Sequence, residues 1–207
     1  MRRRLACRAA LALLLGGGFG RDTVAQGVAQ RAAILVATPS LAGSMFARSV
    51  VVVAQAPDGN TIGLILNRPL EGTWPSDIPA PDGGAPGARV FLGGPLAPQA
   101  YFALAEGVGS VEGAFALAEG IALAAGSAAV RRLLGATSGG RRKLFRGYAG
   151  WADGQLAQEI SGGFWTARPL APDLLFDAAP EAMWERLAAA GRAVRVPPGV
   201  TGLPPPA

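Results

Sequence analysis

The 207-residue sequence contains no histidine and a single cysteine, Cys7. Ser-His-Asp and Cys-His catalysis both require an imidazole, so these two mechanisms are excluded. Structural zinc sites draw their ligands from several cysteines or histidines, so cysteine-rich zinc sites and every histidine-ligated metal are excluded as well. One thiol cannot form an intramolecular disulfide. We therefore predict no metal site, no cofactor and no catalytic residue, and a protein that is not an enzyme.

Lysine is also scarce, since Lys143 is the only one, and the positive charge is unevenly placed. The net charge is +5, but residues 1–25 hold five arginines and one aspartate. The remainder has 14 basic and 13 acidic residues, which is a net charge of +1. A nearly neutral body gives no strong indication of a nucleic-acid partner.

Residues 1–25 have the pattern of a signal-peptide-like leader. An arginine-rich start precedes an apolar run from Ala9 to Phe19, and the small residues up to Ala25 permit cleavage before Gln26. The run is too short to span a bilayer, so no transmembrane segment is predicted. These features favour an exported, periplasmic protein. A start codon placed too far upstream, or a cytoplasmic N-terminal arm, would instead leave the protein in the cytoplasm.

Apolar β-rich runs alternate with turn residues from residue 33 onward. The turn Pro57-Asp58-Gly59-Asn60 between two such runs predicts a β-hairpin with strands at about residues 48–55 and 61–66. The Pro- and Gly-rich residues 71–88 predict an exposed loop. Further strands are expected within residues 32–38, 89–96, 99–107, 143–151 and 164–170.

Three segments show helical spacing of apolar residues. Residues 127–136 place Val130, Leu133 and Leu134 on one face, with Gly135 as a stop. The other two helices are expected within residues 152–163 and 179–192, the latter beginning near Pro180. Strands early in the chain and helices later predict an α+β domain. It covers residues 33–196, between a linker at 26–32 and a disordered proline-rich tail at 197–207.

Five segments in order resemble the AlgH/YqgE family of bacterial proteins, whose biochemical function is uncharacterised. They are ILVATPSLAGSMFARSVVVVAQ, GLILNRPL, VFLGGPL, GYAGWADGQLAQEI with FWTARP, and LLFDAAPEAMWERLAAAG. The resemblance covers roughly residues 33–200. It implies a single compact domain with a coiled, bifurcated, mostly antiparallel β-sheet and peripheral helices. It also implies a link to regulation of transcription, but it supplies no catalytic residue.

Strand ends supply the residues best suited to bind a ligand. If these ends converge, they would offer an amide, a guanidinium and backbone N–H groups for a carboxylate or phosphate. The structural alternative is that Asn67 caps a turn, that Arg68 pairs with a carboxylate such as Asp153, and that the glycines form tight turns. The candidate ligand-binding residues are Asn67, Arg68, Gly93, Gly94, Gly150, Trp151 and Gln155. Trp151 and Gln155 are four apart, so they are expected to share a face.

Two other patterns could indicate nucleic-acid binding or catalysis, but each also has a structural explanation. One is a basic cluster without interleaved aromatic residues, which would be needed to stack bases. Its members are Arg131, Arg132, Arg141, Arg142, Lys143 and Arg146. The other is a nucleophilic Ser44, which would need Lys143 as its base.

The leading hypothesis is therefore a non-enzymatic binding or regulatory module whose partner is a protein or a small ligand. The alternative is an enzyme, or a protein that binds a small anion or metabolite, using the turns at Asn67-Arg68 and Gly93-Gly94. A deep polar pocket that joins these turns would favour the alternative, and a flat apolar surface or a shallow groove would favour the leading hypothesis.

Overall fold

The computed structural model describes residues 32–80, 89–137 and 139–190. The predicted leader, the linker up to residue 31 and the tail lie outside these residues. The strands are β1 (Ala32–Ala37), β2 (Val50–Gln55), β3 (Thr61–Ile65), β4 (Val90–Leu92), β5 (Leu96–Glu106), β6 (Ala114–Ala118), β7 (Ile121–Ala125), β8 (Arg142–Trp151) and β9 (Trp165–Pro169). The helices are η1 (Pro39–Leu41), α2 (Ser127–Ala136), α3 (Gln155–Ser161), α4 (Pro172–Leu175), η2 (Pro180–Ala182) and α5 (Met183–Ala189).

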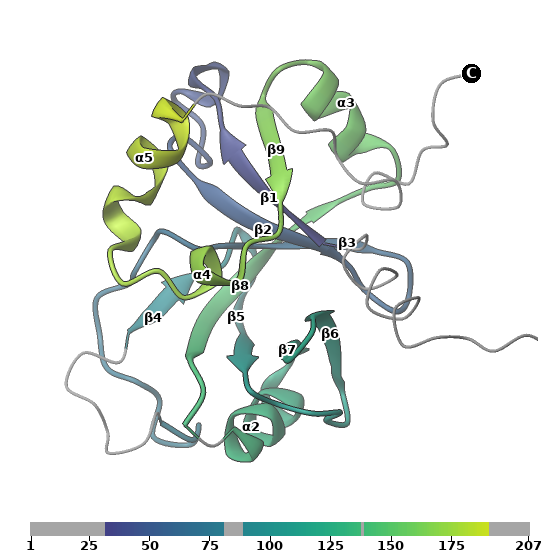
Figure 1. Ribbon diagram of the computed structural model, residues 1–207, viewed down its shortest axis with the longest axis vertical. Coiled ribbons are helices and arrows are strands. Elements are labelled where there is room, and N and C mark those ends of the chain that lie inside the picture. The colour runs from purple at the N-terminus through teal and green to yellow at the C-terminus, as the bar shows by residue number, and fades with distance from the viewer. Residues whose placement is uncertain (1–31, 81–88, 138, 191–207) are drawn as a thin grey trace, which may run out of the picture.

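The nine strands form one curled sheet in the order β6-β7-β5-β8-β3-β2-β1-β9, with β4 attached to β8. Only the β4–β8 pair is parallel; the other pairs are antiparallel. Figure 1 shows two lobes: β1, β2, β3 and β9 lie with α3 and α5, whereas β5, β6 and β7 lie with α2. The long strand β8 belongs to both. The predicted α+β domain with a mostly antiparallel, bifurcated sheet is confirmed.

The two strands β1 and β2 are apolar throughout because both of their faces are covered. Every residue of β1 is buried, and so are the first five residues of β2. Ile34 and Val36 belong to the core shared with the second lobe, whereas Leu35 packs on the opposite face with Trp165. A strand covered on both faces has no polar side to show to water, which explains the unbroken AAILVA and VVVVA runs.

The sheet divides within β8. Residues Arg142–Arg146 pair with β5, and Ala149–Trp151 pair with β3. Gly147 lies between these stretches with φ +69°, a conformation that glycine adopts without strain. Gly93 packs so closely here that an added Cβ would lie 2.1 Å from the Gly147 carbonyl oxygen. The branch point therefore requires backbone in direct contact with backbone.

Helix α2 packs its apolar face on strands of the second lobe that present small side chains. Val130, Leu133 and Leu134 are buried against sheet residues that are mostly alanines, namely Ala103, Ala105, Ala122 and Ala124, with Leu144. Alanines let the helix approach the sheet closely. The predicted boundaries of this helix are confirmed, but Gly135 lies inside the helix, which ends at Ala136.

Two differences from the predicted elements concern short segments. The hairpin β6–β7 was not predicted, and the predicted helix at 179–192 begins as the 3-10 turn η2 before α5. Pro180 is the first residue of η2, as its fixed φ and missing N–H favour. Within the described ranges, no helix is both long and apolar enough to cross a membrane.

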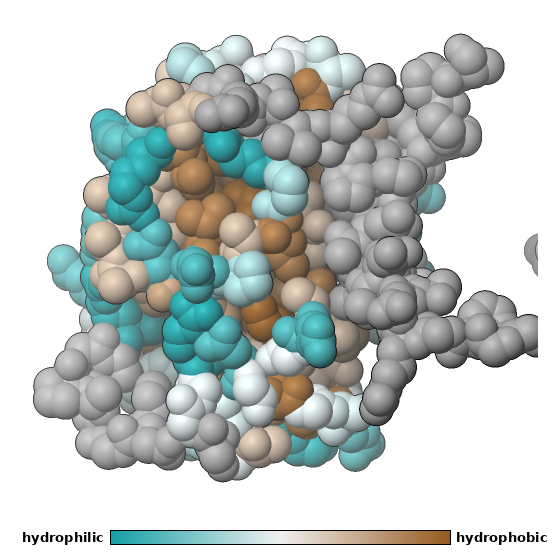
Figure 2. All heavy atoms as spheres, in the orientation of Figure 1, coloured by the Kyte–Doolittle hydropathy of each residue, from teal (hydrophilic) through white to brown (hydrophobic). Residues whose placement is uncertain are grey.

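Apolar residues reach the surface in a band across the middle of one face, and hydrophilic residues border this band (Figure 2). Several half-buried residues pack on the main core from outside it, among them Ile62, Leu170, Leu174 and Leu187. The core is therefore not completely enclosed.

Candidate ligand-binding groove

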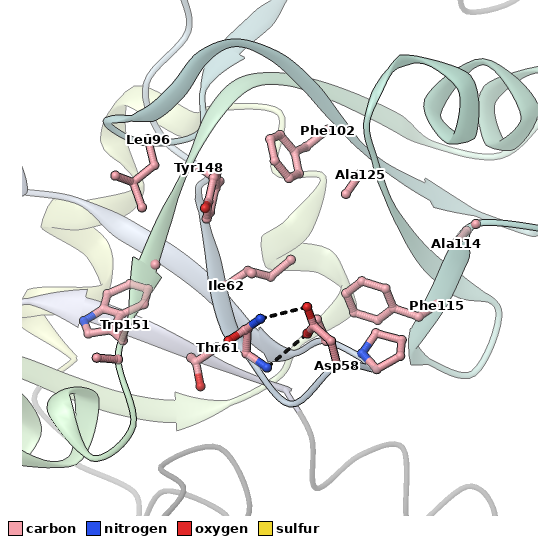
Figure 3. A pocket seen from close by; sticks show the side chains of 16 residues that line it. Asp58, Thr61, Ile62, Leu96, Phe102, Ala114, Phe115, Ala125, Tyr148 and Trp151 are labelled. Carbon is pink, nitrogen blue, oxygen red and sulfur yellow. Dashed lines mark hydrogen bonds between the residues drawn. The ribbon is translucent and has the colours of Figure 1, made fainter. Parts of the chain in front are cut away.

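A cavity of about 960 Å³ opens between the start of β3, the end of β8 and the β6–β7 hairpin. Figure 3 shows its side chains converging from these elements, which are distant in the sequence. We call this cavity the groove. Its apolar wall consists of Ile62, Leu96, Phe102, Phe115, Tyr148 and Trp151.

Strand register places one side of the groove. Ile62 pairs with Gly150, and Thr61 pairs with Trp151, so the start of β3 and the end of β8 present neighbouring side chains. Gly150 exposes this edge, because its missing side chain leaves Tyr148 and Leu96 uncovered.

The other side of the groove comes from the second lobe. Phe102 pairs with Ala125 across β5 and β7, and its ring packs against that of Tyr148 with a centroid distance of 5.2 Å. Phe115 reaches the cavity from β6, at the edge of the sheet. The curl of the sheet is what brings Phe115 opposite Ile62, since three strands separate β6 from β3.

Trp151 is held in place from outside the groove by Glu159. The indole Nε1 of Trp151 and that of Trp165 each donate to Glu159 Oε2 at 2.9 Å. Gln155 Nε2 donates to the other oxygen, Oε1, at 2.8 Å. Trp151 ends β8 and does not lie on helix α3, so the predicted shared helical face is wrong, although Trp151 and Gln155 meet at Glu159.

The β2–β3 turn forms the polar rim of the groove. Asp58 Oδ1 accepts a hydrogen bond from the Asn60 backbone N–H at 3.1 Å, and Oδ2 accepts one from Asn60 Nδ2 at 2.7 Å. These hydrogen bonds lower the pKa of the Asp58 carboxyl below its usual value. Asp58 is thus a carboxylate at neutral pH, and within the described part of the chain it is the only charged side chain that lines the groove.

Asn67 and Arg68 lie beyond the opposite end of β3. Five residues of extended chain separate Ile62 from Asn67, a distance of about 16 Å. Asn67 is 9% exposed; its Oδ1 accepts from the Val50 N–H at 2.8 Å, and its Nδ2 donates to the Arg48 carbonyl at 2.9 Å. Arg48 has φ +57°, unusual for a residue other than glycine, and the Asn67 amide bridges this turn.

The Arg68 guanidinium binds the β1–β2 connection. It donates to the Met45 carbonyl and, at 2.7 Å, to the Ala47 carbonyl. Partial burial lowers the pKa of Arg68 below its usual value. The predicted pairing with Asp153 is wrong, since Asp153 is exposed just beyond β8, near the groove end of β3. Asn67 and Arg68 together hold residues 45–50 against the end of β3. We call these two residues the clamp and this end of β3 the clamp end.

Gly93 and Gly94 lie at the branch point and not in the groove. The Gly93 N–H donates to the Arg146 carbonyl at 2.8 Å, and its own carbonyl accepts from the Ile65 N–H at 3.0 Å. A Cβ on Gly94 would lie 2.3 Å from the Tyr148 carbonyl carbon. Of the seven predicted residues, Gly150 and Trp151 line the groove and Gln155 orients Glu159. The predicted convergence of all the strand ends does not occur.

Comparisons with known proteins agree with this architecture. Residues 34–192 match the family described as AlgH-like (DUF179). This chain belongs to the AlgH-like family. A UPF0301 protein of Thermobifida fusca is 35% identical over 171 residues, which cover 75% of this chain and 83% of the relative. A UPF0301 protein of Chlamydia trachomatis is 32% identical over 155 residues, covering 74% and 82%.

Two solved structures share the AlgH-like fold of this chain. The solution structure of AlgH from Pseudomonas aeruginosa matches with a TM-score of 0.58 and 28% identity, over 79% of this chain and 87% of that one. A crystal structure of a Corynebacterium diphtheriae protein matches with a TM-score of 0.58 and 26% identity, over 82% and 90%. The predicted family is therefore confirmed, while the biochemical function of the family is unknown.

The basic cluster of this AlgH-like chain is divided among separate partners. Arg141 pairs with Glu106 at 2.7 Å and with Asp173 at 3.2 Å, and Arg131 pairs with Asp77 at 3.0 Å. Arg132 donates to the Glu112 carbonyl at 3.1 Å, and Arg146 donates to Gln99 Oε1 at 2.7 Å. These contacts hold the arginines in local structure.

Lys143 is buried at the clamp end of β3. It is 5% exposed, its Nζ donates to the Leu66 carbonyl at 2.7 Å, and it lies 4.0 Å from the centroid of the Phe91 ring. Burial lowers the pKa of Lys143 to about 7. The Ser44 hydroxyl donates to the Leu41 carbonyl, so Ser44 and Lys143 do not form the pair that nucleophilic catalysis would require.

Sequence reasoning missed Ile62, Leu96, Phe102 and Tyr148 of the apolar wall, and it also missed the β6–β7 hairpin. Phe115, Ala114 and Ala125 line the groove, yet no strand was assigned there. A signal was present, because two apolar runs flank Glu119-Gly120 and Gly120 has φ +69°. The Asp58 turn was recognised as a hairpin turn but not as the rim of a cavity.

Proposed function

We propose that this protein is a non-enzymatic binding module, and that it takes a largely apolar small ligand, or an apolar segment of a partner protein, into the groove. The observation that carries the proposal is the wall of four aromatic rings, from Phe102, Phe115, Tyr148 and Trp151, around a cavity of about 960 Å³. Cavities of roughly 300–1,000 Å³ with apolar walls and few polar groups are typical of ligand sites. Binding of this kind would suit a regulatory role.

Several apolar side chains of the groove are only partly buried. Aromatic side chains gain about 25 cal/mol for each Å² of apolar surface that is removed from water. In the groove this gain is incomplete, since Leu96 is 43% exposed and Phe115 and Tyr148 are only half-buried. A ligand with an apolar body would complete the burial, which is the driving force for binding.

The alternative site for a small anion has weaker support. It would use the Arg68 guanidinium and the Gly93 N–H, but both already bind backbone carbonyls. The aromatic wall lies at the other end of β3 from Arg68. The groove therefore supports an apolar ligand better than the clamp supports an anion.

A neutral apolar dye, N-phenyl-1-naphthylamine, tests the proposal. Its fluorescence should rise when the protein is added. Ala125→Trp should suppress this rise, because the side chain of Ala125 points into the cavity (Figure 3). Ala128→Trp is the matched control, since Ala128 is an exposed alanine on α2 that does not line the groove. Equal dye binding by both variants would reject the groove as the site.

Export is a separate proposal that rests on the leader sequence alone. Mass spectrometry of the protein isolated from its own cells would test it, because cleavage before Gln26 leaves a chain that begins at that residue. The same measurement under native conditions would show the mass of any ligand that stays bound. An intact N-terminus would contradict cleavage without bearing on the groove.

A further inference from the structure

The charge of the groove is one-sided. Among the described residues that line it, Asp58 is the only one with a charged side chain, and none of them carries a positive charge. Arg132 lies at the edge, where its Nη2 would be 3.2 Å from a Cβ added to Gly113, but its Nε donates to the Glu112 carbonyl and it is not a lining residue. A ligand in the groove therefore meets a negative charge at one end only.

The Asp58 carboxylate is positioned and still has capacity for a ligand. Asn60 supplies one hydrogen bond to each carboxylate oxygen, which fixes the orientation of the group. An ionised carboxylate has about four lone-pair sites, so roughly two stay available for a further donor. Figure 3 shows Asp58 on the same side of the cavity as Phe115, at the end away from Leu96.

The aromatic wall adds a second attraction for positive charge. The faces of Tyr, Trp and Phe rings attract cations, because the ring quadrupole is negative there. Phe115 lies on the same side of the cavity as Asp58 in Figure 3, and the other rings line the rest of the apolar wall. The groove thus has a negative end and a long apolar part.

We infer that the groove selects molecules with a protonated amine at one end of an apolar body, with the amine bound by Asp58 and the body lying against Phe102, Phe115 and Tyr148. This inference rests on the proposed function, because it specifies the ligand chemistry of the same groove. Carboxylates of the same size are disfavoured by like charge at Asp58.

Three probes of equal chain length test the inference: octylamine, octanol and octanoate. Displacement of N-phenyl-1-naphthylamine gives the affinity of each for the full chain. Octylamine should bind about fivefold to tenfold more tightly than octanol, the gain expected from an exposed ion pair with a cation–π contact. Octanoate should bind more weakly than octanol.

Two variants assign the selectivity to one carboxylate. Asp58→Asn removes the charge while keeping a residue suited to the turn, and should reduce the preference for octylamine over octanol to below about twofold. Asp153→Asn is the matched control: this exposed aspartate follows the lining residue Ala152 but does not line the groove. It should leave the preference unchanged.

The outcomes separate this inference from the proposed function. If octanol displaces the dye but octylamine has no advantage, the inference is wrong and the groove remains a binding site for neutral apolar ligands. A preference that survives Asp58→Asn would also overturn the inference. If none of the three probes displaces the dye, the proposed function and the inference both fail.

Discussion

Asn67, which follows β3, is buried and bonded to the backbone of Arg48 and Val50 at the start of β2, whereas Asn60, just before the first residue of β3, is exposed and bonded to Asp58. An asparagine thus stabilises a buried turn at one end of the strand, and another asparagine shapes the exposed rim of the groove at the other end. The clamp end also holds Arg68 and Lys143, and the groove end holds aromatic rings that face a cavity. Stability and binding are therefore assigned to opposite ends of one strand.

The largest expected difference between the two ends comes from their asparagines. Asn67→Ala should lower the free energy of unfolding by about 3 kcal/mol, because it leaves the Val50 N–H and the Arg48 carbonyl without their partner in a buried site. Asn60→Ala should cost less than about 1 kcal/mol, since water can replace its exposed hydrogen bonds. Urea unfolding followed by circular dichroism measures both. Equal losses would contradict the assignment of stability to the clamp end.

Lys143 should make the clamp end sensitive to pH. The unfolded chain keeps the Lys143 proton up to about pH 10.5, whereas the folded protein releases it near pH 7. Between these values the unfolded state binds more protons, so stability should rise with pH, by about 2 kcal/mol from pH 7 to pH 9. Lys143→Met should remove this rise. Urea unfolding at a series of pH values tests it, and a slope retained in the variant would contradict the assignment.

Arg68→Ala should have a smaller effect, with a loss of about 1–2 kcal/mol from the missing bonds to Met45 and Ala47. Hydrogen exchange of residues 42–48 should become faster. Octanol affinity should change less than about twofold, because the groove lies at the other end of β3. Arg68→Lys is the matched control for charge, since an ammonium cannot reproduce the planar, two-pronged contact. Lost octanol binding in a folded Arg68→Ala protein would instead support a ligand-binding role for the clamp.

The smallest change in stability is expected for Glu159→Gln, at about 0.5–1 kcal/mol. The variant weakens the hydrogen bonds that orient Trp151, so octanol affinity should fall about twofold although residue 159 lies outside the groove. Gln158→Ala is the control, because Gln158 is an exposed residue of the same helix that does not line the groove. Titration with octanol, followed by tryptophan fluorescence, measures the effect. Equal affinities in all three proteins would show that Glu159 does not position the wall.

The sequence predicted the secondary-structure elements that are determined by residues close together in the chain. The Pro57–Asn60 turn identified the β2–β3 hairpin, and the spacing of Val130, Leu133 and Leu134 identified α2. The five ordered motifs also led to the correct family. Short, alanine-rich strands such as β6 carry little β-branched or aromatic signal, which is why that hairpin was missed.

The groove could not be predicted from the same signals because it depends on the curl of the whole sheet. Phe115 and Ile62 lie on strands separated by three others, and no sequence spacing states how sharply those strands turn. The polar residues at strand ends did not reveal the role of Arg68. In sequence, a guanidinium that binds backbone carbonyls cannot be distinguished from one that is free to bind an anion. The partners became visible only once the β1–β2 connection was placed.

The bend of β8 at Gly147 has a consequence for the order of folding during synthesis. Residues 142–146 pair with β5, which leaves the ribosome about 40 residues earlier, and residues 149–151 pair with β3, made almost 90 residues earlier. Neither lobe has its full set of hydrogen bonds until β8 has emerged. Contacts of such long sequence separation slow folding. Until β8 pairs with them, the unpaired edges of β3 and β5 can associate with other chains. A chaperone that binds nascent chains should therefore protect this protein most between the synthesis of β3 and that of β8.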